Sequence, residues 1–576
     1  MRYHKLHMQR PMRGMSFVDV IVGTALILII FLALFGLLRA SILISQLTKA
    51  KAIATAVADS QIEYVRSLSY GSVGTLGGIP GGPIPQFSTT TSNGTAYAVR
   101  TFIAYQDDPA DGLGGADSNG IITDYKRIKV TVTYVAGGRT RTVDMISNYS
   151  PIGLETTTGG GTLRLVVVNA ASAPVTGASV RIVNASTTPT VDLTTFSDID
   201  GIVYLPGAAT STQYEVYVSK SGYSSAQTYL RDATNQNPNP GYLTVVTDLT
   251  TTNTFAIDIL SQFQVRTVSP IATTTYSDSF ATGADISSFT NATISVGSIV
   301  LSNASGPYEP SGSARMHPLT PTYLYSWTSA SSTLVTPAGT SVVVRVADGS
   351  GALLPDGVLA GNSTGFTGPI DLSTISTSTY PSLSLVADLS STDIMATPEV
   401  QEWGIGYMRG PVPVPNVDFM LLGAKTIGST GASVSLYKTT IASTTGSTGS
   451  TMLTLEWDAY QLGLSGYDTV DACNAPPYTI PPNTTSETTL YVGPATTNSL
   501  LVSVRDSAGV AVPGASVTLS RTGYSETVTT SACGGAYFGD IGASAAYTIQ
   551  SSKAGYASTN TSGINILGHT FYADSI

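Results

Sequence analysis

The spacing of apolar residues predicts one long helix at the start of the chain and strands after it. Residues 20–38 carry no charge, and apolar residues keep a helical spacing among charged ones to about residue 67. We therefore expect one helix within residues 15–70, with 20–38 as its membrane-spanning half. Gly and Pro are dense in residues 71–85 and predict its end. Beyond them Val, Thr, Tyr and Ile alternate with small polar residues, as in strands.

The apolar run from Val20 to Leu38 is long enough to cross a membrane. At a rise of about 1.5 Å per residue it makes a helix of about 28 Å, close to the thickness of bilayer hydrocarbon. The leader, residues 1–14, has four Lys or Arg and no acid, so we expect it in the cytoplasm and the rest of the chain outside. A secretory signal peptide would have its cleavage site after the apolar core, whereas the Gly14-Met15 junction precedes it.

The order of a basic leader ending in Gly14, then Met15, an acid at Asp19 and an apolar helix resembles the N-terminus of type IV prepilins. The resemblance implies that a prepilin peptidase cuts after Gly14 and methylates the new amino terminus at Met15. It also implies an inner-membrane assembly platform and packing against other pilin subunits through the helix. Asp19 would then pair with the Met15 ammonium of a neighbouring subunit. The family more often has Phe and Glu at these two positions.

The energy of a buried charge independently favours a partner for Asp19. An ionised carboxylate on a membrane helix costs ~2.5 to 3.5 kcal/mol at the bilayer centre. The alternative is an ordinary signal-anchored protein that never assembles, with Asp19 resting at the membrane interface. Cleavage after Gly14 is expected for a pilin-like protein and not for a signal-anchored one, so it distinguishes the two interpretations.

Three alternating segments follow the helix and predict a small antiparallel sheet. They are residues 96–105, 125–134 and 139–146, and the last two flank the hairpin signal Ala136-Gly-Gly138. Pilins and pseudopilins also have a long helix followed by such a sheet. We therefore assign residues 71–152 to a pilin-like sheet.

Five carboxylates without a Lys or Arg lie between the first two of these segments. They are Asp107, Asp108, Asp111, Asp117 and Asp124. A hard cation that takes about six to eight oxygen ligands would relieve their repulsion, which indicates calcium. Some pseudopilins bind calcium in a loop of this region, although the spacing here is not that of an EF-hand. The alternative is a solvated turn that uses Asp and Gly for their backbone preferences. We expect no other cofactor.

An internal repeat occupies two distant parts of the chain. Residues Gly177-Ala-Ser-Val180 recur as Gly514-Ala-Ser-Val517, and a Lys-Xaa-Gly-Tyr motif follows each copy. The distances between the Gly residues, 222 − 177 = 45 and 555 − 514 = 41, agree closely and indicate duplication. The units resemble carboxypeptidase-regulatory-like or collagen-adhesin B-type domains, which are small Ig-like sandwiches. We assign them to residues 162–258 and 498–576.

Two further sandwiches are expected between these copies. A third Gly431-Ala-Ser-Val434 suggests a divergent Ig-like domain at residues 416–495. Residues 259–415 lack the repeat but contain alternating strands, for which a jelly-roll-like sandwich fits. Trp327 and Trp403 would line a glycan-binding face or, as is commoner, be buried in the sandwich. The fold class is therefore mainly β with one long helix: a pilin-like α+β module followed by tandem β-sandwiches.

Charge and cysteine content narrow the range of possible functions. Only 11% of the residues are charged, and loss of the leader changes the formal net charge from −10 to −10 − 4 = −14, which disfavours nucleic-acid binding. Cys473 and Cys533 are the only cysteines, and both are expected outside the cell, where disulfides persist. A bond between them closes a loop of about 60 residues, worth about 4 kcal/mol in the chain-entropy model. The alternative is two free buried thiols.

The chain lacks the signatures of an enzyme. Without the leader it keeps two histidines, His317 and His569, and it has no zinc-spaced cluster, no nucleophile elbow and no local Cys-His signature. The favoured hypothesis is a minor or tip pilin-like subunit of a type IV pilus. Before assembly it would cross the membrane once, and afterwards its ectodomain would bind a glycan or protein target at the cell surface. The alternatives are a pseudopilin of a type II secretion system and the non-assembling surface protein described above.

Overall fold

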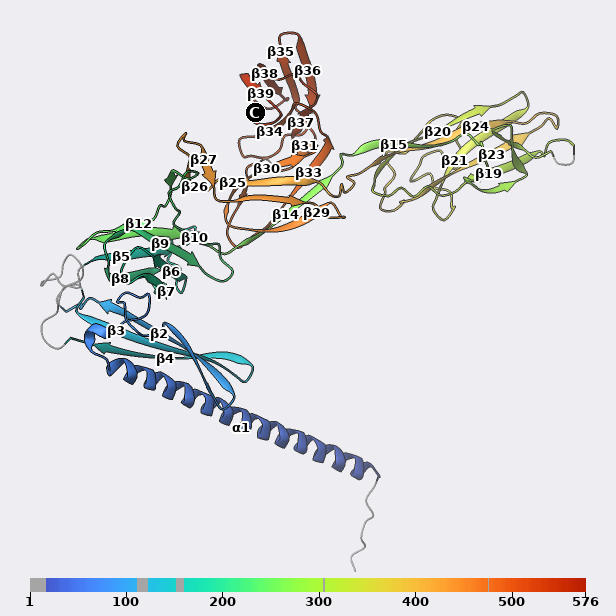
Figure 1. Cartoon of the computed structure of the whole chain (residues 1–576). Coiled ribbons are helices and arrows are strands. Elements are labelled where there is room, and N and C mark those ends of the chain that lie inside the picture. Colours follow the sequence, from blue (N-terminus) through green and yellow to red (C-terminus); the bar gives the residue numbers. More distant parts are fainter. Residues whose placement is uncertain (1–16, 111–122, 152–159, 304–305, 475) are drawn as a thin grey trace, which may run out of the picture. The chain divides into compact units, whose positions relative to one another are not determined.

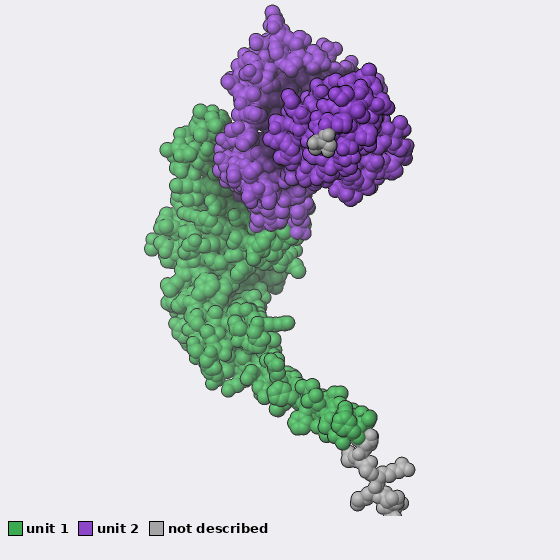
Figure 2. All heavy atoms as spheres, turned by 90° about the vertical axis from the view of Figure 1, so that its right-hand side faces the viewer, with its two compact units in different colours: residues 1–259, 426–436 green, residues 260–425, 437–576 purple. Residues whose placement is uncertain are grey.

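The computed structural model describes residues 17–110, 123–151, 160–303, 306–474 and 476–576. The protein is mainly β with one long N-terminal helix, as the sequence predicts (Figure 1). It divides into two compact units (Figure 2). The first comprises residues 1–259 and 426–436, and the second comprises residues 260–425 and 437–576.

Helix α1, Phe17–Arg66, is unbroken over 50 residues. Its bounds agree with the prediction because the segment contains no Pro and stops before the Gly- and Pro-rich stretch. A short 3-10 turn, η1, Tyr70–Ser72, follows it. The side chains buried by the C-terminal half share one helix face and pack on the adjacent sheet. They are Ala54, Ala58, Ile62 and Val65.

The first sheet is antiparallel, with the order β1-β2-β3-β4. Its strands are β1 Phe87–Ser92, β2 Thr95–Gln106, β3 Tyr125–Ala136 and β4 Arg139–Tyr149. Alternate residues of β3, from Ile128 to Tyr134, are buried, which is the period-2 pattern of the sequence. The sheet and the C-terminal half of α1 share one hydrophobic core, so they form a single α+β module.

A two-sheet sandwich follows in the same unit. One sheet has the order β13-β5-β8 and the other β10-β9-β6-β7, with β12 paired to β9. The strands are β5 Gly161–Val168, β6 Ser179–Asn184, β7 Val191–Phe196, β8 Ile202–Ala208, β9 Ser211–Ser219, β10 Ala226–Gln227, β12 Leu243–Val245 and β13 Thr250–Ala256. Inward-facing residues of both sheets, such as Leu165 and Val180, fill its core.

The C-terminal sandwich has the same strand arrangement. Its sheets have the orders β37-β34-β40 and β36-β35-β38-β39. The strands are β34 Ser499–Arg505, β35 Ser516–Arg521, β36 Tyr524–Thr529, β37 Gly535–Phe538, β38 Ser544–Ser552, β39 Thr559–Ile566 and β40 His569–Ser575. In both copies the first and last strands pair in parallel, β5 with β13 and β34 with β40. This match agrees with a duplication.

The middle sandwich contains a strand that the sequence analysis assigned to the preceding domain. Strand β14, Ser261–Val268, pairs with β29 and β33, so it belongs to this sandwich and not to the domain predicted at 259–415. The two sheets have the orders β29-β14-β33-β31 and β28-β25-β30-β32. The other strands are β25 Asp418–Gly423, β28 Thr440–Thr444, β29 Ser450–Leu455, β30 Asp458–Ser465, β31 Tyr467–Ala472, β32 Tyr478–Ile480 and β33 Thr485–Pro494.

Residues 272–409 form another sandwich, inserted after β14. Its sheets have the orders β17-β18-β24-β20-β22, with β15 paired to β24, and β16-β19-β23-β21. The strands are β15 Ala272–Asp278, β16 Ile286–Thr290, β17 Ala292–Ser295, β18 Ser298–Leu301, β19 Ser311–Met316, β20 Leu324–Val335, β21 Thr340–Asp348, β22 Ile370–Asp371, β23 Leu383–Ser391 and β24 Glu399–Arg409. Trp327 and Trp403 are buried in its core, so these two indoles do not form a glycan-binding face.

The interpretation of residues 431–434 as a third repeat copy is wrong. These residues form the tip of a hairpin between β26 Thr426–Ser429 and β27 Ser435–Tyr437. Val434 is 61% exposed, whereas Val180 and Val517 at the same motif position are completely buried. The hairpin instead pairs through β26 with a short strand of the first unit, β11 Asn237–Pro238. The same four-residue sequence therefore occurs in two different local structures.

Candidate functional site

The N-terminal half of α1 exposes its apolar side chains. Phe17, Phe31 and Leu37 are 79, 68 and 70% exposed, and the apolar residues around them are similarly open. Within the described residues, α1 is the one helix long and apolar enough to cross a membrane by length and composition. The helix thus has two environments along its length, since its second half is part of a folded core and the side chains of its first half are exposed.

A buried lysine ties the turn η1, which follows α1, to the sheet. The Nζ atom of Lys126, in β3, donates hydrogen bonds to the main-chain carbonyls of Tyr70 and Val73, both at 2.7 Å, and lies 4.5 Å from the centre of the Tyr70 ring. Burial lowers the pKa of Lys126 to about 8. The sequence analysis missed this residue. The position of Lys126 in the alternating pattern could have revealed it, because Lys126 shares the inward face of β3 with Ile128 and Val130.

The residues of the processing site lie at or beyond the described start of the helix. Gly14 and Met15 are outside the described residues. Asp19 lies in the first turn of α1, ahead of the uncharged run. Cleavage after Gly14, methylation of Met15 and pairing of Asp19 remain predictions.

The acidic loop is described only at its two ends. Asp107 and Asp124 are 8 and 3% exposed, and Asp111 and Asp117 fall outside the described residues. The main-chain N–H of Asp108 donates to Asp124 Oδ2 at 2.5 Å, and Asp108 Oδ1 accepts from the N–H of Ala110 at 3.0 Å. Carboxylate oxygens are the ligand type that calcium prefers. Among the described residues, no group of three His, Cys, Asp or Glu is placed to hold a metal, and the calcium site remains a prediction.

The two cysteines come together in the second unit. Cys473 follows β31, and Cys533 lies in the turn before β37 of the C-terminal sandwich. Their sulfur atoms are joined, and their Cα atoms are 4.3 Å apart. The link connects the middle sandwich to the C-terminal sandwich.

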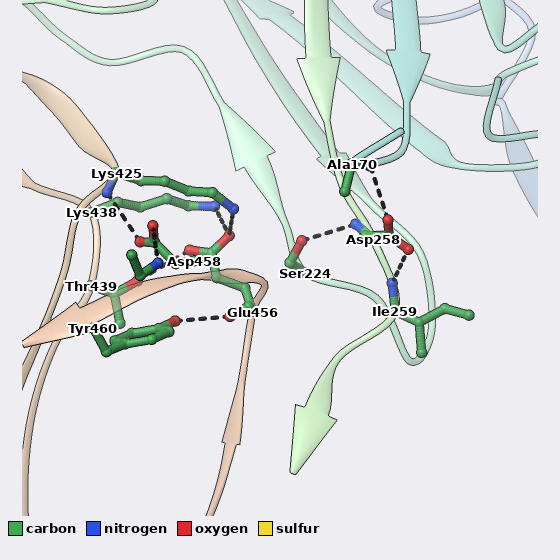
Figure 3. Close-up of polar contacts among 11 residues, drawn as sticks. Ala170, Ser224, Asp258, Ile259, Lys425, Lys438, Thr439, Glu456, Asp458 and Tyr460 are labelled. Carbon is green, nitrogen blue, oxygen red and sulfur yellow. Dashed lines mark hydrogen bonds and ion pairs between the residues drawn. The ribbon is translucent and has the colours of Figure 1, made fainter. Parts of the chain in front are cut away.

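Two partly buried lysines, Lys425 and Lys438, flank the buried carboxylate of Glu456 (Figure 3). Glu456 Oε2 is 2.7 Å from the Nζ atom of Lys438 and 3.2 Å from that of Lys425. The Thr439 hydroxyl donates to Glu456 Oε1 at 3.1 Å. Burial opposes ionisation of Glu456, but its hydrogen bonds and attraction to the two lysines outweigh burial and lower its pKa. Sequence analysis missed this cluster, because its members are up to 31 residues apart and no local pattern links them.

Comparisons with known proteins give no family. Models of known protein families do not match the sequence, and no curated protein matches it. Solved structures are similar only at a low level. The TIE protein of Bacillus anthracis is 11% identical, with 86% of this chain and 73% of that chain covered and a TM-score of 0.15. BcpA, the major pilin subunit of Bacillus cereus, is 11% identical over 72% of this chain and 99% of that chain, with a TM-score of 0.13.

The shaft pilin SpaA of Lactobacillus rhamnosus GG is 15% identical over 29% of this chain and 89% of that chain, with a TM-score of 0.11. Similarities at this level carry no argument about function.

Proposed function

We propose that this protein is a minor or tip pilin-like subunit of a type IV pilus. The observation that carries the proposal is the division of α1 into an exposed apolar half and a half packed on a four-stranded sheet. An exposed apolar helix must be covered by lipid or by other apolar helices. The same half can therefore hold the subunit in a membrane and later pack against helices of other subunits.

The start of the chain supports assembly over simple anchoring. A basic leader, the Gly14-Met15 junction and Asp19 precede the apolar run, in the order found in type IV prepilins. In the proposed sequence of events a prepilin peptidase removes the leader, and an inner-membrane platform adds the subunit to the filament. The Met15 ammonium of one subunit then pairs with Asp19 of the next and relieves the cost of a charge in apolar surroundings.

The size of the ectodomain supports a rare position in the filament. In the described part of the chain, four sandwiches follow the α+β module, and such a mass would crowd a helical array if every subunit carried it. A minor or tip location removes this conflict and leaves the sandwiches free to contact a surface.

Mass spectrometry of the mature N-terminus tests the proposal. Protein from membranes and from sheared surface material should begin with N-methylated Met15. Protein that still begins with Met1 in both fractions would contradict processing and support a plain membrane anchor. The type II secretion alternative predicts the same methylated terminus in membranes but no protein in the sheared filaments.

A further inference from the structure

A cavity of about 310 Å³ lies within the second unit, between the middle sandwich and the C-terminal sandwich. Strands β30 to β33 contribute one wall, and β34 and β40 contribute the other. The volume is at the lower end of the range of about 300 to 1,000 Å³ that small-molecule sites occupy. It suits one small ring better than an extended chain.

The polar side of the cavity is organised by a buried carboxylate. Asp468 is about 1% exposed, and its Oδ2 accepts hydrogen bonds from the hydroxyls of Tyr537 at 2.6 Å and Thr496 at 2.7 Å. Its Oδ1 lies 2.7 Å from Nδ1 of His569, a residue that lines the cavity. The ring nitrogens of His569 are therefore hydrogen-bonding groups at the polar side of the cavity.

The second lining feature is a set of hydroxyl groups. Ser499 is 4% exposed, and its Oγ lies 3.1 Å from Nδ1 of His569. Thr469 and Thr570 also line the cavity. These groups offer several donors and acceptors close together, whereas Lys, Arg, Asp and Glu are absent from the described residues that line the cavity. A ligand here is therefore expected to be uncharged and to carry hydroxyl groups.

The third feature is apolar. The rings of Tyr467, Tyr478 and Phe571 line the same cavity together with leucines such as Leu464. Flat rings can pack on the C–H face of a pyranose, while hydroxyl and imidazole groups bind its hydroxyls. An apolar peptide side chain fits less well, because it would desolvate Ser499 and the imidazole without offering hydrogen bonds in return.

The walls are held together before any ligand binds. The disulfide between Cys473 and Cys533 joins the two sandwiches, and Asp468 bonds to Tyr537 across the same boundary. Fixed walls lower the entropy lost on binding. We propose that this cavity binds a neutral saccharide ring, with His569 and Ser499 as hydrogen-bonding groups. The inference does not depend on filament assembly.

Ligand-observed saturation-transfer NMR on the full-length chain in detergent micelles tests the proposal. The probes are the methyl β-glycosides of galactose, glucose and N-acetylglucosamine. They are used at millimolar concentration because a single small ring is expected to bind weakly. At least one glycoside should receive saturation at its ring C–H protons. The absence of saturation transfer to all three glycosides would overturn the proposal. Transfer only to acetyl-leucine amide, or stronger transfer to N-acetylneuraminic acid, would also overturn it by showing an apolar or anionic site.

Variants test whether the saturation-transfer signal arises from binding in the cavity. Leu464→Trp should abolish the transfer by filling the space, and Ser499→Ala should weaken binding about tenfold through loss of one hydrogen bond. His317→Gln, which changes the other histidine after the leader, should bind as the wild type does. Unaltered binding by Leu464→Trp, with the variant folded by circular dichroism, would contradict the location. The glycoside comparison uses the wild-type chain and is decisive even if a variant fails to fold.

Discussion

The ammonium group of Lys553 donates a hydrogen bond to the main-chain carbonyl of Pro513 at 2.5 Å. Lys220 in the first copy of the repeat makes the same bond to Thr176 at 3.0 Å. Both carbonyls precede the Gly of the Gly-Ala-Ser-Val turn, and each ammonium also lies near the Tyr ring of its own motif. The recurrence of Lys-Xaa-Gly-Tyr thus has a structural cause, since the lysine fastens one turn of the sandwich to another.

Lys553→Met should destabilise the C-terminal sandwich by about 1 kcal/mol, because a hydrogen bond from a charged donor and a cation–π contact are lost. Urea unfolding followed by hydrogen exchange of β35 measures the change. Lys220→Met should act equally on β6 and leave β35 unchanged, which makes each variant the control for the other. If neither variant lowers the stability of its sandwich, the recurrence of the motif has another explanation.

Glu456→Gln should destabilise the middle sandwich by about 3 kcal/mol, because the partly buried ammonium groups of Lys425 and Lys438 lose their shared counter-charge. The matched control is Glu487→Gln, which breaks an exposed pair with Arg266 at 3.5 Å and should change stability by less than about 1 kcal/mol. Denaturant midpoints of the two variants give the comparison. Equal midpoints would contradict the structural importance of the Glu456 cluster.

The pKa of Lys126 should be near 8 in the folded protein, against an ordinary value of 10.5, because burial disfavours its charge. Below pH 8 the folded and unfolded states both bind the proton. Between pH 8 and 10.5 only the unfolded state binds it, so stability should rise with pH relative to Lys126→Met. The 13Cε shift of Lys126 reports the titration. A midpoint above pH 10 would show that the two carbonyl bonds outweigh burial.

Reduction of the disulfide should lower the stability of the linked sandwiches by about 4 kcal/mol, the chain-entropy value for a closed loop of about 60 residues. The double variant Cys473→Ser and Cys533→Ser should behave like the reduced wild type and be insensitive to dithiothreitol. Mass spectrometry under non-reducing conditions checks that the bond forms in exported protein. Identical unfolding with and without reductant would contradict a stabilising bond.

Asp19→Ala should leave membrane insertion intact and reduce incorporation into filaments, because the Met15 ammonium loses its partner. Asp59→Ala, on an exposed position of the same helix outside the apolar run, should incorporate normally. Immunoblots of membrane and sheared fractions give the ratio. Equal incorporation of both variants would rule out the proposed pairing.

Local patterns predict the helix and three of the four strands of the first sheet, but not β1 or the long-range pairing of strands. The segments expected at 125–134 and 139–146 are β3 and β4 with a few extra residues, because alternation and the Gly-Gly turn are encoded locally. The place of β14 depends on partners about 190 and 220 residues away, which no local pattern specifies. The proposed saccharide cavity was missed for the same reason, since Ser499 and His569 meet only after folding.

The inserted sandwich begins and ends side by side, because Ala272 pairs with Arg409 and Val268 bridges Pro413. Tension along the chain can therefore pass across this short junction without stretching the 272–409 fold. In the two repeat copies the first and last strands are parallel neighbours, so a pull on their opposite ends loads many hydrogen bonds in shear at once. A protein built in this way can bear mechanical load through its repeats while one of its sandwiches remains unstrained.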